Sequence, residues 1–241
     1  MKLPEIETPQ YTIELPISKS KLKFRPYLIK EQKILLIATE SKDENSLAEA
    51  LIQVLNNCLL DNTNLKKLPQ VDVEYYFYNL RARSQSEIVT SKYKCQNIVD
   101  DVMCGSIMEN RLNLLTDLEV VNNDNKNIIE ISDTVGIKFR APYFELDELN
   151  KNMDKLSTTD LFDEIVKSIE LIYDENNTYT KDEMTKEQMS NFLDNIPSKK
   201  FEEIDYYFSN LPKIVKNIDI TCKKCGFEHK IVMEDIFSFF I

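Results

Sequence analysis

The stretch Cys222-Lys223-Lys224-Cys225-Gly226 carries the strongest structural signal in this sequence. It lies between two segments of alternating apolar and polar residues, 214–221 and 229–233, and such alternation predicts β-strands. Two cysteines separated by two residues can turn their sulfur atoms to the same side of a tight turn, and the glycine that follows lets the backbone fold closely. We therefore expect a C-terminal β-hairpin with a two-cysteine turn at its tip.

A closed tetrahedral zinc site needs four ligands, so this turn requires a second pair of cysteines. Cys95 and Cys104 provide one, on a turn between candidate strands, although the eight residues between them make a wider spacing than that of a standard zinc knuckle. The sequence thus predicts one structural Zn²⁺ that joins the middle of the chain to the C-terminal hairpin across 117 intervening residues. Its predicted ligands are Cys95, Cys104, Cys222 and Cys225.

Other uses of the cysteines stay open. A C-x-x-C pair can be a thioredoxin-like redox couple, but that arrangement needs a helix after the motif, whereas the residues after Cys225 alternate. The four thiols could also hold no metal, and His229 could replace one of them as a ligand. Catalytic zinc is disfavoured because four thiolates leave no open coordination position. Cys58 falls in the apolar stripe of a predicted helix and is expected to be a small core residue.

The composition argues against several classes of protein. The 241 residues carry 30 Lys and Arg against 41 Asp and Glu, and a net charge of −11 suits sequence-independent nucleic-acid binding poorly. Three glycines and one histidine are too few for a Gly-rich phosphate loop or a His-rich metal site. The longest apolar runs fall far short of the ~20 residues of a membrane span. No catalytic motif or secretory signal is recognisable, so we expect a non-enzymatic protein in a reducing cytoplasm, where paired cysteines indicate metal more often than disulfide.

The order of elements predicts an α+β fold, because helices and strands come in blocks. We expect an N-terminal unit over residues 1–86 that contains a β-hairpin and helices. A β-rich, zinc-ribbon-like unit is expected over 87–143 together with 212–241, with the middle of the chain pairing with the C-terminal hairpin. A helical section over 144–211 would lie between these parts of the chain.

Local signals place several helix boundaries. Asp43 and Ser46 are candidate caps for a helix over 47–59, and Thr185-x-x-Gln188 has the form of a capping box. Apolar periodicity predicts a helix over 160–173, and the Phe-rich end predicts a short helix over 235–241.

Several stretches together carry a family resemblance that covers nearly the whole chain. They are Leu3-Pro4-x-Ile6-x-Thr8-Pro9-x-Tyr11, Lys23-Phe24-Arg25-Pro26-Tyr27-Leu28-Ile29-Lys30-Glu31-Gln32-Lys33-Ile34-Leu35, Val73-Glu74-Tyr75, Leu80-Arg81-Ala82-Arg83-Ser84, the Cys222 hairpin and the Phe-rich end. In these stretches the sequence resembles the baseplate hub subunits and hub assembly proteins of T4-type phages with contractile tails. The match over residues 25–35 is the most specific of them.

The resemblance implies a structural or assembly role in the baseplate hub rather than catalysis. Its implied partners are hub, tail tube or tape-measure proteins, and its implied location is the virion tail baseplate or, during assembly, the host cytoplasm. An assembly chaperone for tape-measure or hub proteins, absent from the mature virion, is the alternative. Zinc would then be a local stabiliser, because the cysteines are not shared by the whole family. The resemblance also carries over six candidate partner-binding residues, whose alternative role is in surface ion pairs and helix caps: Arg25, Lys30, Glu31, Gln32, Arg81 and Arg83.

Overall fold

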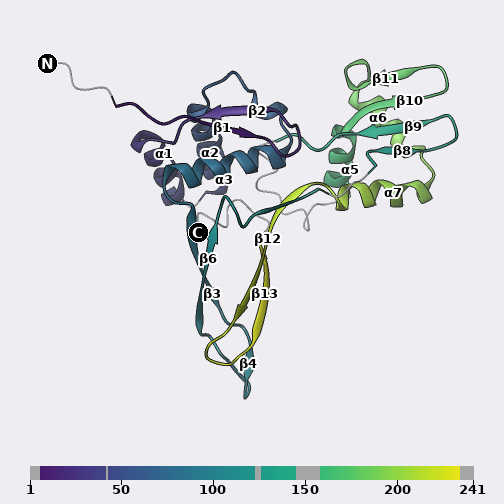
Figure 1. The fold of residues 1–241 in the computed structure, drawn as a ribbon. Helices are drawn as coiled ribbons and strands as arrows, with labels where there is room; N and C mark the ends of the chain where they lie inside the picture. The colour runs from purple at the N-terminus through teal and green to yellow at the C-terminus, as the bar shows by residue number, and fades with distance from the viewer. Residues whose placement is uncertain (1–5, 42, 123–125, 145–157, 234–241) are drawn as a thin grey trace. The chain divides into compact units, whose positions relative to one another are not determined.

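The computed structural model describes residues 6–41, 43–122, 126–144 and 158–233. Over these residues the fold combines six α-helices with several small antiparallel sheets (Figure 1), which confirms the predicted α+β class. The chain divides into two compact units. The first unit comprises Met1–Leu65, Val71–Val121 and Lys213–Ile241, and the second comprises Lys66–Gln70 and Asn122–Pro212. The three-part domain division expected from the sequence stays a prediction.

The N-terminal part of the first unit has the expected hairpin followed by helices. Strands β1 and β2 pair antiparallel, with Tyr11 opposite Phe24. Asp43 caps the second helix, because its carboxylate accepts a hydrogen bond of 2.9 Å from the backbone N–H of Ser46. The elements of this part are β1 (Tyr11–Glu14), β2 (Lys21–Phe24), α1 (Ile29–Ser41), α2 (Glu44–Cys58) and α3 (Gln70–Ser84), of which Gln70 belongs to the second unit. The 3-10 helix η1 (Leu65–Lys67) begins in the first unit and continues into the second.

Buried side chains from all of these helices and from the hairpin hold this part together. The ring of Tyr76 on α3 packs edge-on against Phe24, with ring centroids 5.3 Å apart. The Tyr76 hydroxyl donates a hydrogen bond to the carbonyl oxygen of Leu55 on α2, so the buried phenol has a partner for its polar end. Asp72 is fully buried and accepts hydrogen bonds from the backbone N–H groups of Ile17 and Ser18, which fixes the β1–β2 turn against α3.

The rest of the first unit consists of β-hairpins. Strand β3 pairs with β6 over seven residues, and the short β4 and β5 form a hairpin between them. The C-terminal hairpin of β12 and β13 joins β7 in a three-stranded sheet of order β13-β12-β7, so the middle of the chain pairs with the C-terminal hairpin as expected. The bounds are β3 (Ile88–Lys94), β4 (Ile98–Val99), β5 (Val102–Met103), β6 (Ile107–Asn113), β7 (Glu119–Val121), β12 (Lys213–Thr221) and β13 (Glu228–Met233).

The second unit is a four-stranded antiparallel sheet of order β11-β10-β9-β8 with helices packed against it. Its core joins Ile137, Phe139 and Ile169 of the sheet to apolar side chains of three helices, among them Tyr207 and Phe208. The elements are β8 (Ile128–Glu130), β9 (Gly136–Phe139), α5 (Thr158–Lys167), β10 (Ile169–Tyr173), β11 (Thr178–Thr180), the 3-10 helix η3 (Lys181–Glu183), α6 (Lys186–Asp194) and α7 (Ser198–Ser209).

The helix expected over 160–173 was wrong in its second half. The helix α5 ends at Lys167, and residues 169–173 form β10, which pairs with β9 on one side and β11 on the other. Ile169 and Ile172 have helical spacing, but pairing within the sheet satisfies their backbone groups and decides the outcome. The capping box at the start of α6 is confirmed, since Thr185 and Gln188 exchange hydrogen bonds of 2.8 and 3.1 Å. The helix expected over 235–241 lies outside the described residues.

Candidate metal centre

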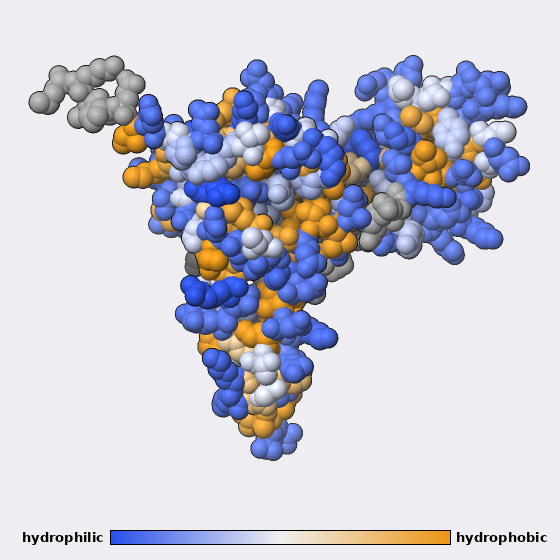
Figure 2. Space-filling view, in the orientation of Figure 1, coloured by the Kyte–Doolittle hydropathy of each residue, from blue (hydrophilic) through white to orange (hydrophobic). Residues whose placement is uncertain are grey.

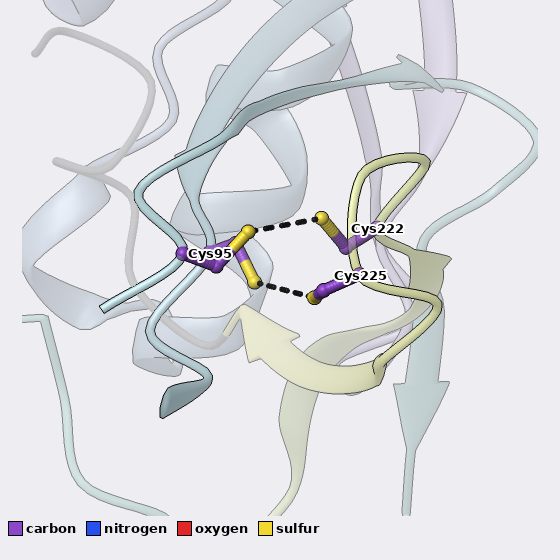
Figure 3. A group of neighbouring side chains, drawn as sticks. Cys95, Cys222 and Cys225 are labelled. Carbon is purple, nitrogen blue, oxygen red and sulfur yellow. Dashed lines mark hydrogen bonds between the residues drawn. The ribbon is translucent and has the colours of Figure 1, made fainter. Parts of the chain in front are cut away.

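The four predicted cysteines lie together in the first unit. Their sulfur atoms are all within 4.8 Å of one another, and Figure 3 shows Cys222 and Cys225 directed toward the side where Cys95 lies. Cys95 and Cys104 follow β3 and β5, whereas Cys222 and Cys225 occupy the turn between β12 and β13. Two pairs of strands that are distant in sequence therefore bring four thiols to one point. We call this group the cysteine cluster.

The distances within the cysteine cluster fit a tetrahedral metal ion better than a disulfide. The Cys95 and Cys225 sulfur atoms are 3.6 Å apart, and those of Cys104 and Cys222 are 3.8 Å apart. A disulfide would need about 2.05 Å. Four sulfur atoms placed tetrahedrally at a Zn–S distance of about 2.3 Å would be about 3.8 Å from one another. The four thiols can thus hold a metal ion with little rearrangement.

Backbone hydrogen bonds shape both turns that carry the cysteines. In the first turn, the N–H of Cys104 donates to the carbonyl of Asn97, and the N–H of Gly105 donates to the carbonyl of Cys95. In the second, the N–H of Gly226 donates to the carbonyl of Cys222 at 2.8 Å. Gly105 and Gly226 have φ angles of +63° and +74°, a conformation that favours glycine. This explains why the residue after Cys104 and the residue after Cys225 are both glycine.

The electrostatic surroundings of the four sulfur atoms differ. Backbone N–H groups of Cys225 and Lys224 lower the pKa of Cys222 to about 6, against the opposing effect of burial. The backbone N–H of Phe227 likewise lowers the pKa of Cys225. Burial raises the pKa of Cys95 to about 12. Cys222 and Cys225 thus form thiolates more readily than Cys95, and thiolates are the form that binds metal.

Three polar groups surround the cysteine cluster. His229 Nε2 lies 3.2 Å from the Cys95 sulfur, a position suited to a hydrogen bond with that sulfur and also close enough for the alternative of a ligand. Asn97 Nδ2 lies 3.6 Å from the Cys225 sulfur, and Lys224 Nζ donates to the carbonyl of Cys104 at 3.1 Å. No sequence pattern pointed to Asn97, apart from its place two residues after a cysteine. The C-x-x-C turn leads into strand β13 rather than a helix, which disfavours the thioredoxin-like alternative.

Arg25 and Glu31, two of the candidate partner-binding residues, form an ion pair with each other. Arg25 Nη2 donates to Glu31 Oε1 at 3.0 Å, and Arg25 also donates to the carbonyl of Asn57 at the end of α2. The Glu31 side chain is fully buried and accepts a further hydrogen bond of 2.8 Å from the Leu28 N–H. The pair therefore joins the start of α1 to the end of α2. It packs beside Cys58, which is confirmed as a core residue and whose pKa burial raises to about 11.

The other four candidates are more accessible. Lys30 is largely exposed, and Gln32 is half-buried on the first turn of α1. Arg83 forms an exposed ion pair with Glu87 and lies over the ring of Tyr11. Arg81 is half-buried, and its Nη1 atom is buried without a hydrogen-bond partner among the described residues. Partner binding by any of the six residues stays a prediction.

The sequence predicts no membrane-spanning segment, because its apolar runs are too short. None of the helices in the described part of the chain is both long and apolar enough to cross a bilayer.

Comparison with known proteins identifies the family. A family model described as "T4 bacteriophage base plate protein" matches residues 8–241, nearly the whole chain. Neither the curated proteins nor the solved structures gave a match. Membership in a baseplate family implies the phage tail baseplate as the location and other phage structural proteins as partners. The chain belongs to the T4 bacteriophage base plate protein family.

Proposed function

We propose that this protein is a structural or assembly component of the baseplate hub and that it acts by protein–protein contact without catalysis. The observation that carries the proposal is the family match over residues 8–241. The assignment to the hub is finer than that match, and it is supported by the likeness of the stretch Lys23–Leu35 to hub subunits. Its partners would be hub, tail tube or tape-measure proteins.

In this proposal the cysteine cluster holds one structural Zn²⁺. The support is the clustering of four sulfur atoms within 4.8 Å and the two separations close to those of a tetrahedral ZnS₄ site. With all four positions taken by thiolates, the ion would have no site for water or substrate. It would instead fix the turn after β3 to the turn after β12, which reduces the conformational freedom of the unfolded chain.

One observation favours the alternative of an assembly chaperone for tape-measure or hub proteins. Helix α1 exposes three large apolar side chains on one side, those of Ile29, Leu36 and Ile37. Their spacing of seven and eight residues places them along one face, which an apolar face of a helical client could cover. A chaperone of this kind would leave before the virion is complete.

Quantitative mass spectrometry of purified virions and of infected-cell lysate tests the proposal. A hub component is expected at a fixed, low copy number in purified virions, in constant ratio to other baseplate proteins. Abundance in the lysate with absence from virions would overturn the hub-component proposal and support the chaperone.

A further inference from the structure

The β4–β5 hairpin, residues 98–103, exposes an unusual concentration of apolar side chains. Ile98 and Val102 are 67% and 68% exposed, and Val99 and Met103 are 43% and 54% exposed. Ile98 pairs with Met103 and Val99 with Val102, so the two pairs lie on opposite faces of the hairpin. The described part of the chain therefore covers neither face. Figure 2 shows hydrophobic surface near the end of the first unit where Figure 1 labels β4.

The turn of this hairpin consists of two acidic residues in a strained conformation. Asp100 and Asp101 have φ angles of +49° and +63°. Two-residue hairpin turns of this kind favour Asn-Gly, because positive φ costs free energy for residues other than glycine. The turn thus keeps two carboxylates at its end at a cost in stability, which indicates a use for the charges.

The cysteine cluster holds the base of the hairpin. Cys95 and Cys104 flank it, and the N–H of Cys104 donates to the carbonyl of Asn97 at 2.8 Å. From the C-terminal turn, Lys224 Nζ donates to the carbonyl of Cys104. A metal ion bound by the four thiols would fix both ends of the hairpin, so its apolar side chains would be ordered before any partner binds.

From these observations we propose that the β4–β5 hairpin inserts into an apolar pocket of another baseplate protein, with Lys or Arg side chains at the inner end of the pocket facing Asp100 and Asp101. The inference rests on the proposed function and names its contact surface. A second copy of this chain fits less well, because each copy carries a net charge of −11. A lipid bilayer fits less well too, because the two carboxylates would enter it first. A protein pocket with apolar walls and basic side chains at its inner end matches both the apolar side chains and the acidic turn.

The test uses baseplate subassemblies isolated from an infection by phage that lacks this gene. Binding of the purified, labelled full-length protein is measured for the wild type, for an Ile98→Ser/Val102→Ser variant and for an Asp100→Asn/Asp101→Asn variant. Ile128→Ser on β8 is the matched control, since Ile128 is 46% exposed and belongs to the second unit. Metal content and melting temperature are measured for every variant, to show that each is folded.

The expected result is that the double serine variant loses at least about tenfold in affinity while Ile128→Ser binds as the wild type does. The double asparagine variant keeps side chains that tolerate positive φ but removes both carboxylate charges. It should therefore stay folded, bind more weakly than the wild type and show a shallower dependence of affinity on salt. Wild-type affinity of the folded double serine variant would overturn the inference alone. So would binding of the full-length protein to vesicles of anionic phospholipid, or its self-association, if the serine substitutions abolish it. A wild-type protein that binds no subassembly would overturn the proposed function together with the inference.

Discussion

Replacing Glu31 with glutamine tests the buried ion pair that joins α1 to α2. The Glu31 carboxylate accepts hydrogen bonds from Arg25 Nη2 at 3.0 Å, Arg25 Nη1 at 3.4 Å and the Leu28 N–H at 2.8 Å. Its side chain is fully buried and that of Arg25 is 14% exposed, so solvent screens the pair little. Glutamine keeps the shape of the side chain but removes the charge that faces Arg25.

We expect Glu31→Gln to lower the free energy of unfolding by about 2–4 kcal/mol. Breaking a buried pair typically costs about 3–5 kcal/mol, because the remaining charge is left without compensation. The cost should fall toward the lower end here, because Arg25 still donates hydrogen bonds to the carbonyl oxygens of Pro26 and Asn57. The side-chain amide oxygen of the new glutamine can also still accept the hydrogen bond from the Leu28 N–H. Asp163→Asn is the matched control: its partner Lys186 is 3.0 Å away, but both side chains are at least half exposed, so the loss should stay below about 1 kcal/mol.

The effect should also depend on pH. Burial alone would raise the pKa of Glu31, but hydrogen bonds from Arg25 and Leu28 and the charge of Arg25 outweigh it, and the pKa is lowered. A carboxyl group with a lowered folded-state pKa stabilises the fold above its unfolded pKa of about 4.3, and this contribution is lost as the pH falls through the folded-state value. The difference between wild type and Glu31→Gln should therefore be largest at neutral pH and shrink below about pH 4. Urea unfolding followed by circular dichroism at several pH values measures it. A difference under about 0.5 kcal/mol at pH 7, or one that is constant down to acid pH, would show that the charge of Glu31 does not stabilise the fold.

Three further substitutions test the cysteine cluster and the second unit. Cys222→Ser should abolish stoichiometric zinc and the sensitivity of the melting temperature to chelators, whereas Cys58→Ser, outside the cluster, should keep both; equal zinc content in the two variants would count against the four-cysteine site. Gly226→Ala should weaken zinc binding about fivefold, corresponding to about 1 kcal/mol, because a Cβ there meets no atom within 4 Å and only the positive φ opposes it. Unchanged affinity in a competition titration would contradict this. Gly136→Ala should cost about 1–3 kcal/mol, because the new Cβ would overlap the Tyr173 ring, at 2.7 Å from Cε1 and closer still to Cζ and Oη. Tyr173→Ala in the same chain should remove that penalty in a double-mutant cycle of unfolding free energies, and full additivity would speak against the overlap.

Residue types at short spacing allowed the most reliable sequence predictions. The alternation around Cys222 and Cys225 predicted the β12–β13 hairpin, and the Thr185–Gln188 spacing predicted the start of α6. The same local reasoning failed at β10, where pairing with β9 and β11 overrides helical spacing. Local pattern cannot detect partners that are distant in sequence, and these decide between the two structures.

In the candidate site too, short-range sequence patterns predicted some features, whereas features that depend on distant residues were missed. The four cysteines were predicted from their spacing, because cysteine pairs with a following glycine are chemically distinctive. The β4–β5 hairpin was not predicted from the sequence. Its strands have two residues each, and its Asp100-Asp101 turn lacks the usual asparagine and glycine. The burial of Glu31 was equally invisible, because it depends on Arg25 reaching the end of α2, which the sequence around Glu31 does not encode.

We propose that cysteines from two distant segments bind one zinc ion. X-ray absorption at the zinc edge, on full-length protein purified without added metal and with its zinc content quantified, is the decisive test of this site. We expect one zinc per chain, surrounded by four sulfur atoms at about 2.3 Å. Protein that is folded without stoichiometric zinc, or a zinc shell that contains nitrogen from His229 in place of one sulfur, would contradict it.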